Sequence, residues 1–114
     1  MKLTHSCIIT NRVNELCDFY KLVLQIQPQI FGKDYVEFPT DGGILSFFSF
    51  DAQEKYAAGT TKPAFNKSLE LEFNVDNVEE EYERVKKLNV EIAKPLTTQE
   101  WSNRSFYFKD PDGN

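Results

Sequence analysis

Apolar and polar residues alternate along residues 3–10 (LTHSCIIT), which is the two-residue period of a β-strand. His5 and Cys7 share one side of this strand. The period then changes, because apolar residues recur three and four positions apart over residues 12–24, and this predicts an amphipathic helix. Asn11 stands directly before the helix and is predicted to be its N-cap. The apolar positions of the helix are Val13, Leu16, Cys17, Tyr20, Val23 and Leu24.

Three short strand candidates follow the helix. They cover residues 26–31 (IQPQIF), 35–39 (YVEFP) and 44–50 (ILSFFSF), and turns that contain Gly and Asp separate them. The first part of the chain, residues 1–51, is therefore predicted to be a β-α-β-β-β module.

A linker is predicted at residues 52–66. This stretch mixes Ala, Gly, Thr, Lys and Pro without a sustained strand period, although a short helix over residues 51–58 is compatible with it. Because 114 residues suffice for one domain with a modest core, we expect residues 1–114 to form a single domain.

The second half repeats the order of strand, capped helix and strand. Residues 68–75 (SLELEFNV) alternate, with apolar residues on one face and Glu70 and Glu72 on the other. Asp76 is predicted to cap the next helix, and Glu79, three residues later, to complete a capping box. The pattern then predicts a buried helical stripe at Val78, Tyr82, Val85 and Leu88, a strand at 90–95, a loop at 96–103 and a strand at 104–110.

The two halves match at an offset of 65 residues, as 76 − 11 = 65 for Asp76 and Asn11. The first half has three strands after its helix, whereas the second has two and then the turn sequence DPDGN at residues 110–114. We therefore expect a second module at residues 67–114 that lacks its last strand. That strand would follow Asn114.

Composition and charge narrow the function classes. The net charge is −5 and the pI is about 4.9, which argues against a nucleic-acid partner because such partners require clustered Lys and Arg. The acidic balance fits a cationic or neutral small ligand, and it fits ordinary solubility equally well. With no long apolar run and no signal-peptide pattern, we expect no membrane association and a cytoplasmic location.

Cysteine and aromatic residues carry little recognisable catalytic pattern. The two cysteines, Cys7 and Cys17, are expected to be free and mostly buried thiols. Cys7 lies about 7 Å along the strand from His5, too far for direct activation of a thiol. Seven aromatic residues exceed what one small core needs, so some should line a cleft or an interface: Phe47, Phe48, Phe50, Trp101, Phe106, Tyr107 and Phe108. Trp101, in a predicted loop, is a candidate for contact with a ligand or a partner subunit.

Three stretches give the chain a resemblance to the vicinal oxygen chelate superfamily, which includes glyoxalase I, bleomycin resistance proteins and extradiol dioxygenases. They are HSCIITNRVNELCDFYKLVLQI, LELEFNVDNVEEEYERVKKLNVEI and EWSNRSFYFKDPDGN, and the last is most similar to the bleomycin-resistance-like branch. The resemblance implies an α+β fold of two β-α-β-β-β modules, whose curved mixed sheets enclose a cleft, and a homodimer.

The resemblance also implies metal ligands on the first, fourth, fifth and eighth strands. His5 stands at the first of these positions and Glu70 at the fifth-strand position, while residues 44–50 offer no His, Cys or carboxylate. A divalent metal is possible on His5 and Glu70. Two ligands would bind it poorly, so no cofactor is expected.

We therefore predict a small-molecule binding or sequestering protein with an acidic, aromatic-lined cleft and no metal. The alternative is a metal-dependent lyase or dioxygenase of the same superfamily that uses His5, Glu70 and a ligand beyond Asn114. A protein-interaction domain with an empty cleft is a third reading. The predicted ligand-binding residues are His5, Cys7, Phe48, Phe50, Glu70, Trp101 and Tyr107.

Overall fold

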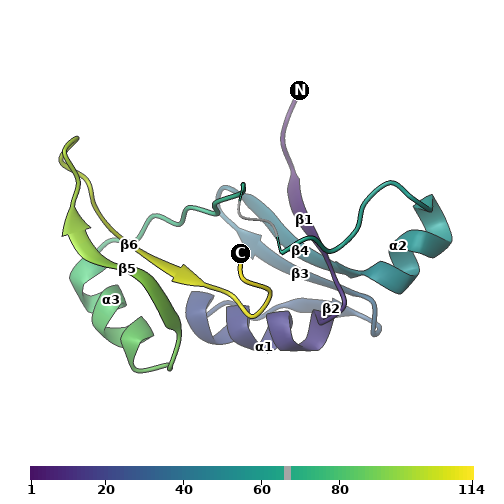
Figure 1. The fold of residues 1–114 in the computed structure, drawn as a ribbon, viewed down its shortest axis with the longest axis horizontal. Helices are drawn as coiled ribbons and strands as arrows, with labels where there is room; N and C mark the ends of the chain where they lie inside the picture. The colour runs from purple at the N-terminus through teal and green to yellow at the C-terminus, as the bar shows by residue number, and fades with distance from the viewer. Residues whose placement is uncertain (66–67) are drawn as a thin grey trace. The chain divides into compact units, whose positions relative to one another are not determined.

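A computed structural model describes residues 1–65 and 68–114 and divides the chain into two compact units, Met1–Phe65 and Asn66–Asn114. The predicted linker end and module start at residues 66 and 67 lie outside the described residues. The elements are β1 His5–Thr10, α1 Val13–Leu24, β2 Gln29–Phe31, β3 Tyr35–Thr40, β4 Gly43–Ser49, α2 Phe50–Ala57, α3 Val78–Lys86, β5 Glu91–Thr98 and β6 Arg104–Lys109 (Figure 1).

The first unit is a mixed four-stranded sheet in the order β1-β4-β3-β2, which confirms the predicted α+β class. β1 and β4 are parallel, and the other neighbouring strands are antiparallel. Helix α1 covers one face, where the Tyr20 ring lies 5.0 Å from that of Phe47 and 6.3 Å from that of Phe38. The core residues of this unit are Val13, Leu16, Cys17, Tyr20, Val23, Val36, Phe38, Leu45, Phe47 and Ala52.

Helix α1 begins one residue later than its predicted cap implies. The N-cap is Arg12, not Asn11, and it makes no side-chain capping bond. The Arg12 amide donates to the buried Thr10 hydroxyl at 2.9 Å, so the last residue of β1 holds the N-cap residue of the helix. The helix ends at Gln25, whose φ of 56° is left-handed.

The strand predicted at residues 44–50 ends at Ser49, because Ser49 starts a helix. Its hydroxyl accepts a hydrogen bond from the Ala52 amide at 3.1 Å, so Phe50 is the first residue of α2 and not a strand residue. The predicted linker therefore contains a helix, close to the short helix considered at residues 51–58. The strand predicted at 26–31 is also shorter and covers only Gln29–Phe31.

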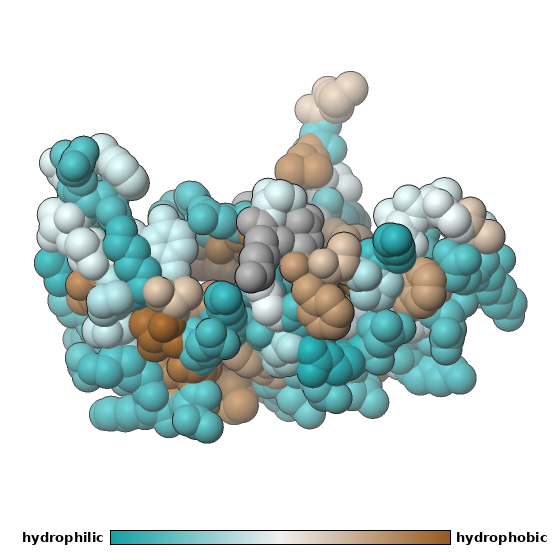
Figure 2. Space-filling view, viewed as in Figure 1, coloured by the Kyte–Doolittle hydropathy of each residue, from teal (hydrophilic) through white to brown (hydrophobic). Residues whose placement is uncertain are grey.

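The second unit contains α3 and a two-stranded antiparallel sheet of β5 and β6. Tyr82 of α3 packs on Phe106 of β6, with 5.1 Å between the ring centroids. β5 continues to Thr98, into the predicted loop. Of the predicted helical stripe Val85 is fully buried, while Val78, Tyr82 and Leu88 are half-buried. Figure 2 shows hydrophilic residues over α3 on the visible face, consistent with its outward Glu and Lys side chains.

The strand predicted at residues 68–75 is not formed, and the reason is the lack of a described strand beside it. Leu69, Phe73 and Val75 are 44%, 38% and 45% exposed, and the segment pairs with no described strand. In the first unit the corresponding strand, β1, hydrogen-bonds to β4. The structure describes no strand in the equivalent place of residues 68–114, so the segment has the right pattern but no neighbour.

The cap of α3 is also one residue later than predicted. Asn77, not Asp76, is the N-cap, and its side chain accepts from the Glu80 amide at 3.1 Å. Glu79 closes no capping box, because its carboxylate pairs with Arg104 Nε of β6 at 2.8 Å. That ion pair joins the start of α3 to the sheet.

The predicted turn at residues 110–114 is confirmed. Asp110 accepts hydrogen bonds from the amides of Asp112 and Asn114, and Gly113 has a φ of +85°. Within the described residues, no helix is both long and apolar enough to cross a membrane.

Candidate functional site

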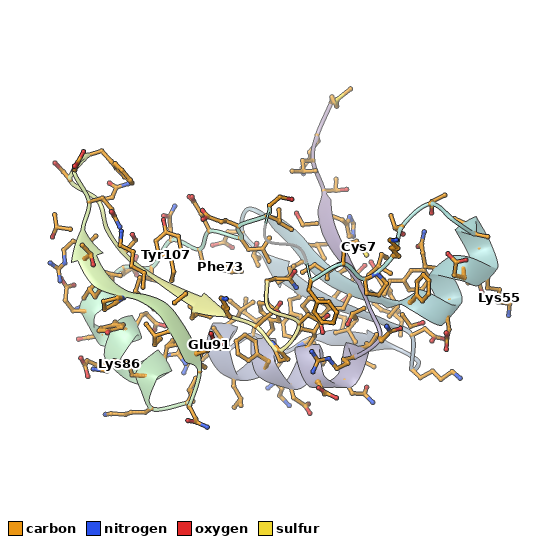
Figure 3. The ribbon with its side chains drawn as sticks, viewed as in Figure 1. Cys7, Lys55, Phe73, Lys86, Glu91 and Tyr107 are labelled. Carbon is orange, nitrogen blue, oxygen red and sulfur yellow. The ribbon has the colours of Figure 1, made fainter. Side chains whose placement is uncertain are left out.

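The face of the first sheet that lies opposite α1 gathers polar and aromatic side chains from three strands. Strand register places Cys7 of β1 opposite Ser46 of β4, and Ser46 opposite Glu37 of β3. Residues opposite one another in register share a face, and every second residue along a strand lies on the same face. The polar–aromatic face therefore comprises His5, Cys7, Tyr35, Glu37, Ser46 and Phe48, and Figure 3 labels Cys7 on β1.

Glu37 is the centre of a hydrogen-bonded group on this face. The Tyr35 hydroxyl donates to Glu37 Oε1 at 2.8 Å, and His5 Nε2 lies 3.4 Å from the same oxygen. His5 Nδ1 lies 2.9 Å from Thr4 Oγ1. The Glu37 side chain is 16% exposed and that of His5 is 39% exposed, so the carboxylate is partly shielded and the imidazole forms its outer edge.

Tyr35 stays a hydrogen-bond donor in this group. Burial raises the pKa of its hydroxyl, and the Glu37 carboxylate raises that pKa further, while the nearby Ser46 hydroxyl acts in the opposite direction. The Tyr35 proton is thus held firmly and keeps the carboxylate oriented.

A row of aromatic rings crosses the same face from β2 to α2. The Phe31 and Tyr35 rings are 5.6 Å apart, those of Tyr35 and Phe48 are 5.8 Å apart, and those of Phe48 and Tyr56 are stacked at 6.4 Å. Phe31 is 53% exposed and Tyr56 is 75% exposed. The aromatic row therefore offers ring surface to solvent directly beside Glu37.

The two cysteines differ in environment. Cys17 is buried in α1, as predicted, and burial raises the pKa of its thiol. Cys7 is exposed on the polar–aromatic face, so the prediction that both thiols are mostly buried is wrong for Cys7. The reason is that α1 covers only the other face of β1.

The remaining predicted ligand-binding residues lie outside this face. Phe50 is half-buried at the start of α2. Trp101 is 67% exposed in the loop between β5 and β6. Tyr107, labelled in Figure 3, lies on β6 with Lys94 Nζ 6.0 Å from its ring centroid. Of the predicted set, His5, Cys7 and Phe48 are the residues that the structure brings together.

The two residues considered for a divalent metal, His5 and Glu70, belong to different compact units. Glu70 is exposed and lies outside any strand, in the second unit. Both ring nitrogens of His5 already lie within hydrogen-bond distance of protein oxygens. Across residues 1–65 and 68–114, no group of three or more His, Cys, Asp or Glu side chains is arranged to hold a metal ion.

Three residues of this face and its aromatic row were not predicted from the sequence: Glu37, Tyr35 and Tyr56. A signal for the first two was available, because YVEFP alternates and its apolar residues Val36 and Phe38 must face the helix. A carboxylate on the other side of a central strand is a candidate for function. Tyr56 gave no comparable signal, since α2 was only a possible helix within a linker.

The fold resembles several solved structures. A glyoxalase/bleomycin resistance protein/dioxygenase from Nocardioides matches with a TM-score of 0.83 and 18% identity, over 99% of this chain and 78% of that one. A protein of unknown function from Agrobacterium tumefaciens str. C58 matches with a TM-score of 0.82 and 23% identity, over 99% and 88% of the chains. A glyoxalase-related enzyme from Fulvimarina pelagi matches with a TM-score of 0.80 and 18% identity, over 98% and 82%.

Sequence comparison assigns the family. No curated protein matches the chain. The family model of the Glyoxalase/Bleomycin resistance protein/Dioxygenase superfamily, however, matches residues 2–114. This match spans both units and agrees with the fold of the structural neighbours. The chain therefore belongs to the Glyoxalase/Bleomycin resistance protein/Dioxygenase superfamily.

Proposed function

We propose that this protein binds a small molecule without the help of a metal, and that the polar–aromatic face of the first unit is the binding surface. The observation that carries the proposal is the Glu37 carboxylate, which lies on the same sheet face as the exposed aromatic row. A ligand with an aromatic ring and a cationic or hydrogen-bond-donating group would satisfy both features.

The hydrogen bonds of Glu37 support this role. The contacts with Tyr35 and His5 both end on Oε1, so they leave Oε2 for a donor from a ligand. Tyr35 fixes the carboxylate from within the sheet, which lowers the entropic cost of binding. The net charge of −5 adds a weak attraction for cations.

The other predicted contacts remain part of the proposal. Cys7 and Phe48 line the same face, and Phe50, Glu70, Trp101 and Tyr107 stay proposed ligand-binding residues on other elements of the two units. We also propose a homodimer, which the exposed Trp101 and the exposed apolar side chains of residues 68–75 support. The molar mass in solution tests this part, and a monomer at all concentrations would contradict it.

Titration with benzamidine, an aromatic cation, tests the binding proposal, and benzamide is its neutral control. NMR chemical shifts of residues 5–10, 35–40 and 43–49 should follow benzamidine more strongly than benzamide. Glu37→Gln should weaken benzamidine binding about tenfold, because it removes a charged hydrogen-bond partner. Glu100→Gln, at an exposed position in the loop after β5, is the matched control and should change nothing. Equal binding of benzamidine by the Glu37→Gln variant would contradict the proposal.

A further inference from the structure

His5 occupies the carboxylate that we assign to the ligand. A carboxylate oxygen only accepts hydrogen bonds, so the 3.4 Å contact with Glu37 Oε1 requires a proton on His5 Nε2. In the neutral ring Nδ1 is then an acceptor, and the Thr4 hydroxyl at 2.9 Å is its donor. Thr4, His5 and Glu37 therefore form one directed chain of hydrogen bonds that ends on the proposed anchor.

Thr4, the first residue of this hydrogen-bond series, is bound to the sheet through its backbone. The Thr4 carbonyl accepts a hydrogen bond from the Ile44 amide of β4 at 2.9 Å. A Cβ atom at Gly43 would lie 3.4 Å from the same carbonyl oxygen, so the backbone of Thr4 lies close against β4. The imidazole is consequently held over Glu37 by an ordered backbone.

The weakest of these hydrogen bonds is the one between His5 and Glu37. The Nε2–Oε1 distance of 3.4 Å is long for a hydrogen bond, while the Tyr35 bond to the same oxygen is short at 2.8 Å. His5 is also the more exposed partner, at 39% against 16% for Glu37. A donor that arrives from solvent therefore meets His5 first, and the His5 contact costs less to break than the Tyr35 contact.

We propose that His5 is an internal, displaceable partner of Glu37: a forked cation such as an amidinium donates to both carboxylate oxygens, so it bonds Oε2, takes the place of His5 Nε2–H on Oε1, and the imidazole swings away. This inference rests on the proposed function and adds an autoinhibitory contact to the same site. It assigns to His5 a role that opposes ligand binding, with Thr4 as the residue that positions the ring.

Affinity measurements with benzamidine test the sign of the effect. His5→Ala should bind benzamidine about two- to fivefold more tightly than the unaltered chain, which is the range of a weak, partly exposed hydrogen bond. Thr4→Val keeps the size of the side chain but removes the hydroxyl, and it should give a smaller gain. In a Glu37→Gln background the gain from His5→Ala should vanish, because the competition has no target. Weaker binding by His5→Ala, or the same gain in the Glu37→Gln background, would overturn the inference.

A second measurement does not depend on a ligand. Long-range ¹⁵N NMR of the His5 ring should show the tautomer with its proton on Nε2, and Glu37→Gln should shift that nitrogen. Unchanged ring shifts in this variant would overturn the contact itself. If benzamidine binds none of the variants while the ring shifts respond to Glu37→Gln, the proposed function fails and the His5–Glu37 contact stands.

Discussion

Both compact units contain a helix that is followed by antiparallel strands, but they differ in how their helices and first segments are held. In the first unit β1 has a strand neighbour, and α1 covers a core that includes Phe38 and Phe47, both with no exposed surface. In the second unit the segment 68–75 has the same alternation as β1 but no described neighbour, and Val85 is the one apolar side chain described there that is fully buried.

This difference shows that an alternating sequence pattern alone is not enough to form a β-strand. A β-strand needs hydrogen bonds to a neighbour, and a two-stranded sheet is marginally stable in water. Alternation of apolar residues indicates which side of a segment can be buried. Hydrogen bonds to a neighbouring strand are needed before the segment forms a β-strand. The first unit has both requirements and also carries the candidate site.

The largest expected effect comes from the core of the first unit. Phe47→Ala should lower the free energy of unfolding by about 3–5 kcal/mol, because it removes a fully buried ring that packs on Tyr20 and Phe38. Phe106→Ala is the matched change in the second unit and should cost less, because Phe106 is half-buried. Urea denaturation measures both. Equal losses of unfolding free energy in the two variants would contradict the difference in burial between the two units.

Hydrogen exchange should separate the two first segments directly. Amides of β1 that bond to β4 should exchange on the order of 100-fold more slowly than those of residues 69–75, which have no strand partner. Exchange followed by NMR gives both sets in one experiment. Similar protection of the two segments would mean that residues 69–75 are paired in solution.

The helix caps give a smaller and local test. Asn77→Ala should destabilise α3 by about 1 kcal/mol, because the Asn77 side chain accepts from the Glu80 amide. Asp76→Ala should cost much less, since Asp76 is not the N-cap. Thermal unfolding of the two variants compares them. A larger effect of Asp76→Ala would restore the cap predicted from the sequence.

The smallest expected effect is a pH dependence at Tyr35. Its pKa is raised above 10.0 in the folded protein, so the folded state holds this proton more tightly than the unfolded chain. Its stabilisation is complete below pH 10 and is lost as the pH rises from 10 through the folded-state pKa. Tyr35→Phe should flatten the alkaline part of a stability-against-pH curve, and an unchanged slope would contradict this.

Much of the fold could be predicted because its signals are local. The helical spacing at residues 12–24 and the alternation at residues 35–39 produced α1 and β3 nearly as expected. Capping residues were missed by one position at both Asn11 and Asp76. At the start of α1 the Thr10 hydroxyl accepts from the Arg12 amide, and at the start of α3 the Asn77 side chain accepts from the Glu80 amide.

The candidate site could be predicted only in part. His5 and Cys7 were predicted to share one side of a strand, but Glu37 and Tyr35 lie about thirty residues from His5 in sequence and reach it through strand pairing. Glu70 was expected on a strand beside Glu72, whereas the structure shows it exposed and outside any strand.

By itself the sequence determined the α+β class, the order of elements in the first unit up to β4, the shared strand face of His5 and Cys7, and the turn at Asp110–Asn114. These features depend on periods of two and 3.6 residues and on the conformational preferences of single residues. Only the tertiary structure decided which segments pair, that Glu37 lies beside His5, and that Tyr56 extends the aromatic row. Contacts between residues distant in the chain depend on strand register and helix packing, which no local pattern specifies.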